Sequence, residues 1–219
     1  MEQEDLKELA RQLACPEGEL GIALGDKMNE MNTFITERSI IALEPVQDEH
    51  ILEVGFGNGK LSIPVIEAIG INGYFIGVET SSVLAQQAIT HFNQNAFTQV
   101  TVLSDDCHSI SIENNTLDGV LAVNVLYFID DLDAFFHRIN GWLKPGGRTV
   151  IGVRSSDSLE EMPFTQFGFN IRTLVIIKQA MHDAGFINVE SEYFDEGVTQ
   201  FDDLELPIDT LIIKAIKIY

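Results

Sequence analysis

The hydrophobic positions of the chain follow two alternating patterns. Short runs rich in Val, Ile and Phe are separated by longer stretches whose apolar residues recur as on one face of a helix. The short runs predict strands over residues 50–54, 74–79, 100–103, 117–123 and 148–153. The longer stretches predict helices over residues 60–69, 82–93 and 131–143. This alternation is typical of a mostly parallel sheet with helices on both faces.

The pattern changes after Arg154. A stretch of loop-like composition is followed by a predicted helix over residues 171–184 and by two strand-like runs, 187–194 and 210–219. Because no helix separates the two runs, we expect an antiparallel hairpin at one edge of the sheet. The expected fold class is therefore α/β, with seven mostly parallel strands, an antiparallel C-terminal strand and helices on both faces.

The first 45 residues lie outside the alternation and have helical character. We therefore expect an N-terminal helical extension over residues 1–45, which could serve as a lid, and one domain over residues 46–219. The hydrophobic fraction of 45% in 219 residues is enough for a single full-sized core.

The acidic balance of the chain narrows its expected partners. Its 34 acidic and 13 basic residues give a formal net charge of -21, which repels phosphate backbones and anionic membrane surfaces. We therefore expect neither nucleic acid nor a membrane as a partner. The sequence has no apolar run of about 18 residues and no signal-peptide pattern at its start, so we expect a cytoplasmic protein. A monomer and a homodimer both remain open.

The two cysteines, Cys15 and Cys107, lie far apart and have no sequence neighbours typical of a metal site. We expect reduced thiols and no disulfide. Paired acids occur in several places, but loop and cap acids explain them in so acidic a chain. The sequence therefore predicts no metal site.

A glycine-rich segment carries the first chemical signal. The strand ending near residue 54 leads into Gly55, Gly57 and Gly59, and Glu53 precedes the first glycine by two positions. Glycine can adopt a positive φ, which lets a ligand lie against the main chain. Lys60 stands where a dinucleotide fingerprint has its third glycine, and an acid here would repel a pyrophosphate. A cationic nucleoside such as S-adenosylmethionine fits better.

EVGFGNG at Glu53–Gly59 resembles the first motif of class I S-adenosylmethionine-dependent methyltransferases. FIGVETS, SDDC, LDGVLAVNVLYFIDD and LKPGGR resemble later segments of that family in the same order, over about residues 45 to 155. The similarity is closest to the small-molecule, quinone-biosynthesis-like branch, methyltransferase type 11. The resemblance implies a Rossmann-like fold and methyl transfer from S-adenosylmethionine to a small-molecule acceptor, with S-adenosylhomocysteine as product.

The resemblance also implies a set of cofactor-binding residues: Glu53, Gly55, Gly57, Gly59, Glu79, Thr80, Leu84, Asp106, Cys107 and Asn124. Glu79 ends the second strand, where a carboxylate can accept hydrogen bonds from both ribose hydroxyls. Leu84 would pack on the adenine face, although core packing of a helix explains it equally well.

Three later residues complete the implied set. Only one of the adjacent acids Asp105 and Asp106 should reach the adenine amino group, and the spacing to LDG favours Asp106. Cys107 would offer its backbone amide to the ring. Asn124, after the fourth strand, could accept a hydrogen bond from the ammonium group of the methionine part.

The sequence does not identify a catalytic residue. Methyl transfer from a sulfonium is an in-line displacement, so the protein must mainly align the acceptor and exclude water. A base is needed only if the acceptor holds its proton. Tyr127 and His108 are the candidates, and buried packing for Tyr127 and a surface position for His108 remain open.

The acceptor should meet parts outside the common core, namely residues 21–39 and 158–170. Both segments mix Met and Phe with small polar residues. Seven of these side chains could form an apolar pocket: Met28, Met31, Phe34, Met162, Phe164, Phe167 and Phe169. Core packing of an added helix is the alternative.

Two other functions stay open at this point. One is a non-catalytic regulator that binds S-adenosylmethionine, and the other, which Glu53 and Lys60 disfavour, is a nicotinamide-dependent oxidoreductase.

Overall fold

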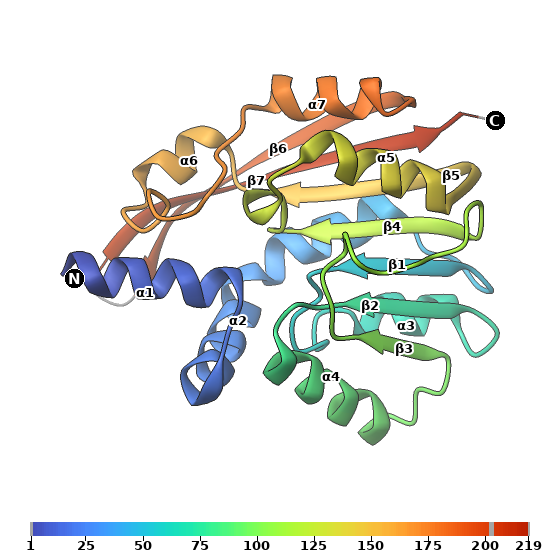
Figure 1. The fold of residues 1–219 in the computed structure, drawn as a ribbon, viewed down its shortest axis with the longest axis horizontal. Coiled ribbons are helices and arrows are strands. Elements are labelled where there is room, and N and C mark those ends of the chain that lie inside the picture. The colour runs from blue at the N-terminus through green and yellow to red at the C-terminus, as the bar shows by residue number, and fades with distance from the viewer. Residues whose placement is uncertain (1, 202–203, 219) are drawn as a thin grey trace.

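The computed structural model describes residues 2–201 and 204–218. Within them, seven strands form one sheet in the order β3-β2-β1-β4-β5-β7-β6 (Figure 1). The strands are β1 His50–Val54, β2 Tyr74–Val78, β3 Val100–Leu103, β4 Leu117–Val123, β5 Leu143–Val153, β6 Phe186–Phe201 and β7 Leu204–Lys217. The first five run parallel to one another, whereas β7 is antiparallel to both β5 and β6. The expected fold class is confirmed.

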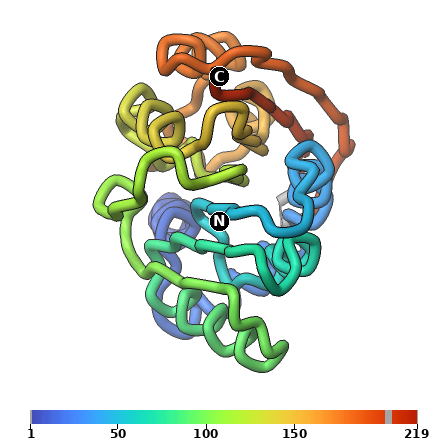
Figure 2. Tube along the Cα trace, turned by 90° about the vertical axis from the view of Figure 1, so that its right-hand side faces the viewer, coloured from blue at the N-terminus to red at the C-terminus, as the bar shows by residue number. Residues whose placement is uncertain are grey.

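Helices cover both faces of the sheet. They are α1 Gln3–Ala14, α2 Gly18–Leu43, α3 Ile63–Ile69, α4 Ser82–Gln94, α5 Leu132–Trp142, α6 Ser156–Glu161 and α7 Leu174–Asp183, with a 3-10 turn η1 at Leu126–Phe128. Figure 2 shows α5 and the second half of α2 on opposite sides of the sheet. No helix of the described residues combines the length and the apolar character needed to cross a membrane.

The core has one layer on each face of the sheet, as the two-residue repeat of a strand requires. In β1, Ile51 packs with the side chains of α2, α3 and α4, whereas its neighbour Leu52 packs with those of α5 and α7. Both side chains are fully buried. This double burial explains why the parallel strands appear as continuous apolar runs in the sequence.

The first four predicted strands differ from the structure by at most one residue, and the later elements differ more. β5 begins at Leu143 rather than at 148, so Pro145, Gly146 and Gly147 lie inside the strand. It forms an irregularity there, because Leu117 pairs with Leu143 while Gly119 pairs with Arg148. Four residues of β5 thus stand opposite one residue of β4.

The C-terminal hairpin is longer than the apolar pattern predicted. Pairing continues past Phe194 to Phe201↔Leu204, with a register shift between Asp195 and Val198. The polar composition of this part hides it from a pattern based on hydrophobicity. The last predicted residue of the second strand, 219, lies outside the described residues.

The stretch after Arg154 that was expected to be a loop contains α6. Ser155 caps this helix, because its side-chain oxygen accepts a hydrogen bond from Ser158 N at 3.1 Å. α7 begins at Leu174 rather than at 171. Arg172, before α7, donates hydrogen bonds to the backbone carbonyls of Leu126 and Ile129. These bonds attach the segment between α6 and α7 to η1.

The N-terminal region forms two helices, and their roles in packing differ. The second half of α2 contributes the fully buried Ile35 and Leu43 to the core under the sheet. α1 and the first half of α2 lie at the edge toward which the parallel strands point (Figure 1). Parallel α/β sheets bind their ligands at this edge.

Candidate functional site

A cavity of about 450 Å³ lies at the carboxyl ends of the parallel strands. The segments that follow β1, β2, β3 and β4 line one part of it. The rest is lined by residues of α1 and α2, by the segment between β5 and α7, and by β7. Nine of the ten residues expected to bind a cofactor line this cavity: Glu53, Gly55, Gly57, Glu79, Thr80, Leu84, Asp106, Cys107 and Asn124.

The three glycines of the loop after β1 have positive φ values of 69°, 62° and 77°. A Cβ at Gly55 would lie 2.4 Å from Val125 Cγ2, and one at Gly59 would lie 2.5 Å from Phe92 Cζ. These two glycines therefore allow close packing, and Gly59 is not among the residues lining the cavity. A Cβ at Gly57 would meet no protein atom of the described residues within 4 Å. Gly57 thus leaves room for a ligand beside the main chain.

Glu53 is an acid buried at the floor of the cavity. Its side chain is 4% exposed, and its Oε2 atom has no hydrogen-bond partner among the described residues. Burial raises the pKa of Glu53 to about 7; the nearby Ser62 hydroxyl acts in the opposite direction, and the charge of Glu79 adds to the rise. A buried carboxylate oxygen without a partner is costly, so this position favours a ligand that donates hydrogen bonds or carries positive charge.

The raised pKa of Glu53 predicts a pH-dependent stability. Its ordinary value is 4.5, so between about pH 4.5 and pH 7 the folded protein binds more protons than the unfolded chain. The contribution to stability is therefore complete below pH 4.5 and is lost as the pH rises toward 7. The side chain of Glu53→Gln stays neutral at every pH, so this variant does not lose that contribution. The difference in free energy of unfolding between Glu53→Gln and the wild type should therefore shift in favour of the variant by about 3 kcal/mol from pH 4.5 to pH 8.

Urea unfolding of the ligand-free wild type and of Glu53→Gln at pH 5, 6, 7 and 8 measures this difference. Two curves that stay parallel over the whole range would contradict the account of Glu53.

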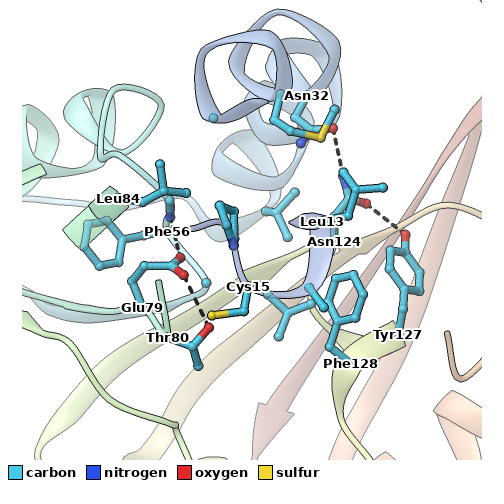
Figure 3. Close-up of a pocket in the computed structure, with 18 of the residues that line it drawn as sticks. Leu13, Cys15, Asn32, Phe56, Glu79, Thr80, Leu84, Asn124, Tyr127 and Phe128 are labelled. Atoms are coloured by element: carbon cyan, nitrogen blue, oxygen red, sulfur yellow. Dashed lines mark hydrogen bonds between the residues drawn. The ribbon is translucent and has the colours of Figure 1, made fainter. Parts of the chain in front are cut away.

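Glu79 connects two loops at the mouth of the cavity. Its Oε2 accepts a hydrogen bond from Gly57 N at 2.9 Å, and its Oε1 accepts one from Ser81 N at 2.8 Å. Burial raises the pKa of Glu79, although these amides act in the opposite direction. Ser81 Oγ also caps α4 by accepting from Leu84 N at 3.3 Å, and Leu84 lies beside Glu79 in Figure 3.

The segment after β3 presents two exposed aspartates to the cavity. Asp105 and Asp106 both line it, so the structure brings the two candidates together. Asp106 Oδ1 accepts a hydrogen bond from His108 N at 2.7 Å, and Asp105 Oδ1 accepts one from Asp106 N at 2.8 Å. The assignment of adenine recognition to Asp106 stays a prediction.

Cys107 is buried, and burial raises the pKa of its thiol to about 12. Potential ligand atoms of Asp106, Cys107 and His108 lie within 4.8 Å of one another, although the sequence predicted no metal site here. The raised pKa disfavours the thiolate that metal binding requires. His108 does not line the cavity, although it was a catalytic candidate.

A chain of hydrogen bonds crosses the cavity from α2 to the segment after β5, and Figure 3 shows its part from Asn32 to Tyr127. Asn124 Nδ2 donates to Asn32 Oδ1 at 2.9 Å, and Tyr127 Oη donates to Asn124 Oδ1 at 2.8 Å. The backbone N of Arg154 in turn donates to Tyr127 Oη. Asn124 has a positive φ of 55°, a conformation that asparagine tolerates better than most residues. Asn32 was not expected from the sequence.

Tyr127 is 6% exposed, and burial raises the pKa of its hydroxyl. Its proton is directed at Asn124, so the hydroxyl positions neighbouring groups and does not act as a base.

Tyr127→Phe is expected to lower the free energy of unfolding by about 1 to 3 kcal/mol, because it leaves Arg154 N without its acceptor. Differential scanning calorimetry measures the loss as a lower Tm. Tyr193→Phe is a matched control, since Tyr193 is 58% exposed, and it should change stability by less than about 0.5 kcal/mol. Equal losses in the two variants would contradict the role of Tyr127.

Polar contacts also join the first half of α2 to the glycine loop. Asn29 Nδ2 donates to Asn58 Oδ1 at 3.1 Å, and Lys60 Nζ lies 2.7 Å from Asp26 Oδ1. The Lys60–Asp26 pair is about half exposed. Lys60 was considered only as a departure from the dinucleotide fingerprint, and its partner 34 positions earlier could not be found from local sequence.

The apolar side of the cavity differs in two residues from the predicted pocket. Five of the seven predicted side chains line it: Met28, Met31, Met162, Phe164 and Phe169. The prediction was wrong for Phe34 and Phe167, which are not lining residues. Phe34 packs against Phe194, with ring centroids 5.7 Å apart. The α2 residues that line the cavity are at positions 24, 25, 28, 29, 31, 32 and 36, and Phe34 lies beyond the edge of the helix face that they form.

Comparisons with known proteins agree with this geometry. Residues 51–147 match the model of a family described as "Methyltransferase domain". A relative, phosphoethanolamine N-methyltransferase 2 of Caenorhabditis elegans, is 25% identical over 65% of this chain and 33% of its own length. The chain thus spans about a third of the length of this curated relative.

Two solved structures share the fold. An S-adenosylmethionine-dependent methyltransferase from Aquifex aeolicus superposes with a TM-score of 0.71 at 14% identity, covering 90% of this chain and 98% of that one. Phosphoethanolamine N-methyltransferase 2 of Haemonchus contortus, solved with phosphomonomethylethanolamine and S-adenosylhomocysteine, gives 0.68 at 17% identity, covering 84% and 53%. The family match over residues 51–147 and the similarity to the relatives confirm the resemblance of the chain to class I S-adenosylmethionine-dependent methyltransferases, and the solved structures show that it shares their fold. The quinone-biosynthesis-like branch stays a prediction.

Proposed function

We propose that this protein transfers the methyl group of S-adenosylmethionine to a small-molecule acceptor. The observation that carries the proposal is the pair of buried acids at the glycine loop. Glu53 keeps an unpartnered oxygen at the floor of the cavity, and Glu79 ties Gly57 and Ser81 together at its mouth. Two acids in this place favour a ligand that has a cationic group and hydroxyl donors and lacks phosphate.

The residues present fit the cofactor. Glu53 and Asn124 would hold the amino-acid part, and Glu79 with Thr80 would hold the ribose. Leu84, Asp106 and Cys107 would surround the adenine, while Gly55 and Gly57 let the main chain approach. Gly59 serves the packing of the loop against Phe92 and supports binding only indirectly.

When bound, S-adenosylmethionine supplies a methyl group on a sulfonium, which an acceptor can displace in line. The protein's part is to align the acceptor and to exclude water. Asn32, Asn124 and Tyr127 form a fixed polar wall for this purpose. Neither Tyr127, whose proton is donated to Asn124, nor His108, which lies off the cavity, has the geometry of a general base. An acceptor that carries a proton would release it to solvent.

We propose that α1 and the first half of α2 act as a lid over the rest of the domain. This lid is shorter than the predicted extension over residues 1–45, because Ile35 and Leu43 in the second half of α2 are fully buried in the core. The support is that residues of α1 and of the first half of α2 line the cavity and that polar contacts attach α2 to the loop at Asn58 and Lys60. The Lys60–Asp26 contact is about half exposed, and exposed polar contacts are easily exchanged for water, so this contact allows opening for ligand exchange.

The C. elegans relative is named for phosphoethanolamine, which is a small molecule. We propose that the partner of this chain is also a small molecule, of a different chemical class, and not nucleic acid. A cytoplasmic location and a monomeric or homodimeric state remain predictions.

Incubation with methyl-labelled S-adenosylmethionine and a fractionated metabolite extract tests the proposal. We expect label in one or a few small molecules together with an equal amount of S-adenosylhomocysteine. Binding of S-adenosylhomocysteine without any labelled product would favour the non-catalytic regulator and overturn the proposed reaction.

A further inference from the structure

The part of the cavity away from the glycine loop is almost entirely apolar. Six side chains from α2 and from the segment after β5 line it: Met28, Met31, Leu159, Met162, Phe164 and Phe169. Leu206 and Ile208 of β7 complete its wall. Five of these eight residues are less than 9% exposed: Leu159, Met162, Phe164, Leu206 and Ile208. Such a surface binds apolar matter and offers few hydrogen bonds.

The basic side chain that lines the cavity is already paired with other protein groups. Among the described residues that line it, Arg154 is the only lysine or arginine, and it is 6% exposed. Its Nη1 atom donates to the carboxylate of Glu196 and to Thr210 Oγ1, the latter at 3.0 Å. Its Nη2 atom donates to the carbonyl of Met31 at 3.1 Å. The guanidinium is therefore neutralised and directed at protein groups.

Negative charge, in contrast, is abundant around the same cavity. Glu53, Glu79, Asp105 and Asp106 all line it. A phosphate or carboxylate brought into this space would lose its hydration without gaining a free cation and would be repelled by these acids. The electrostatics therefore oppose an anionic acceptor, whereas an uncharged acceptor meets no such opposition.

We infer that the methyl acceptor is an uncharged, largely apolar molecule and not a phosphate or carboxylate ester. This inference rests on the proposed function and narrows its acceptor to one chemical class. The nucleophilic atom of such a molecule would lie toward the polar wall of Asn124 and Tyr127, and its apolar body toward Met162 and Phe169.

A matched pair of probes tests the inference: 4-butylphenol and its phosphate ester, 4-butylphenyl phosphate. Both are titrated into the full chain saturated with S-adenosylhomocysteine, with phosphoethanolamine as a third ligand. We expect 4-butylphenol to bind at least about 10-fold more tightly than either phosphorylated probe. Equal or tighter binding of a phosphorylated probe, or no binding of 4-butylphenol, would overturn the inference.

Two phenylalanines of one segment provide matched variants. Phe169 lines the cavity and Phe167 does not. Phe169→Leu should weaken 4-butylphenol binding about 5-fold through lost apolar contact, whereas Phe167→Leu should bind as the wild type does. Equal effects of the two changes would place the probe elsewhere and contradict the inference.

The partner of Arg154 provides a third variant. Glu196→Gln removes the charge that neutralises the guanidinium, so the affinity for 4-butylphenyl phosphate should rise several-fold while that for 4-butylphenol stays the same. If the ratio of the affinities for 4-butylphenyl phosphate and 4-butylphenol is the same in Glu196→Gln as in the wild type, charge does not exclude an anionic acceptor and the inference is contradicted. Failure of the proposed function is distinguishable, because it would appear as the absence of labelled product in the methyl-transfer assay, whereas the inference fails through the ratio of the probe affinities.

Discussion

Glu79→Gln is expected to lower the affinity for S-adenosylhomocysteine about 100-fold. The carboxylate now accepts hydrogen bonds from Gly57 N and Ser81 N, and its charge strengthens any bond from a ribose hydroxyl. A glutamine has one acceptor oxygen, so its NH₂ group would oppose one of these amides. Loss of charge-assisted bonds totalling about 3 kcal/mol corresponds to about two orders of magnitude in Kd.

Isothermal titration calorimetry measures this loss of affinity. A control variant and a control ligand test whether the loss comes from the contact between Glu79 and the ribose. Glu67→Gln removes an exposed carboxylate on α3 and should leave the Kd unchanged. An S-adenosylhomocysteine analogue that lacks the ribose 2′-hydroxyl should bind Glu79→Gln nearly as well as the complete ligand does. If the variant discriminates the two ligands as strongly as the wild type, Glu79 does not contact the ribose.

Gly57→Asn is expected to abolish measurable binding of S-adenosylhomocysteine without unfolding the protein. Asparagine tolerates the positive φ of 62° at this position, and a Cβ there would meet no described protein atom within 4 Å. The free protein can therefore accept the side chain. The ligand cannot, because the new atoms occupy the space beside the main chain that we assign to it.

Gly18→Asn is the matched control for this substitution. Gly18 also has a φ of 62°, has open space around its Cβ position and does not line the cavity. Calorimetric titration should show normal binding by Gly18→Asn, and thermal unfolding should show similar small losses of stability in both variants. Normal binding by Gly57→Asn would refute the placement of the ligand at the loop.

The sequence predicted the centre of the fold well because buried parallel strands leave a strong local signal. β1, β3 and β4 were predicted with the bounds that the structure shows. Each is short, rich in branched residues and bounded by polar segments. The polar half of the β6–β7 hairpin carries no such signal, since its pairing depends on the partner strand and not on its own hydrophobicity.

The cofactor side of the site could likewise be predicted, because the relevant residues follow strand ends in order. The structure places Glu53, Glu79 and Asn124 around one cavity for that reason. Gly59 is the exception, since only the packing of Phe92 distinguishes it from Gly57.

The acceptor side was predicted in part, because it depends on contacts between distant segments. Asn32 reaches Asn124 over 92 positions, and Arg154 reaches Glu196 and Thr210 on the hairpin. No local pattern reveals such pairs. Phe34 shows the same limit, because composition suggested a pocket residue whereas the helical face directs it to Phe194.

Side-by-side titration of the wild-type protein with S-adenosylhomocysteine and with NAD⁺ tests the central claim most directly. The account predicts one site per chain for S-adenosylhomocysteine, with a Kd at least about 100-fold lower than that for NAD⁺, because Glu53 and Glu79 repel a pyrophosphate. Tight binding of NAD⁺ with no detectable affinity for S-adenosylhomocysteine would contradict it.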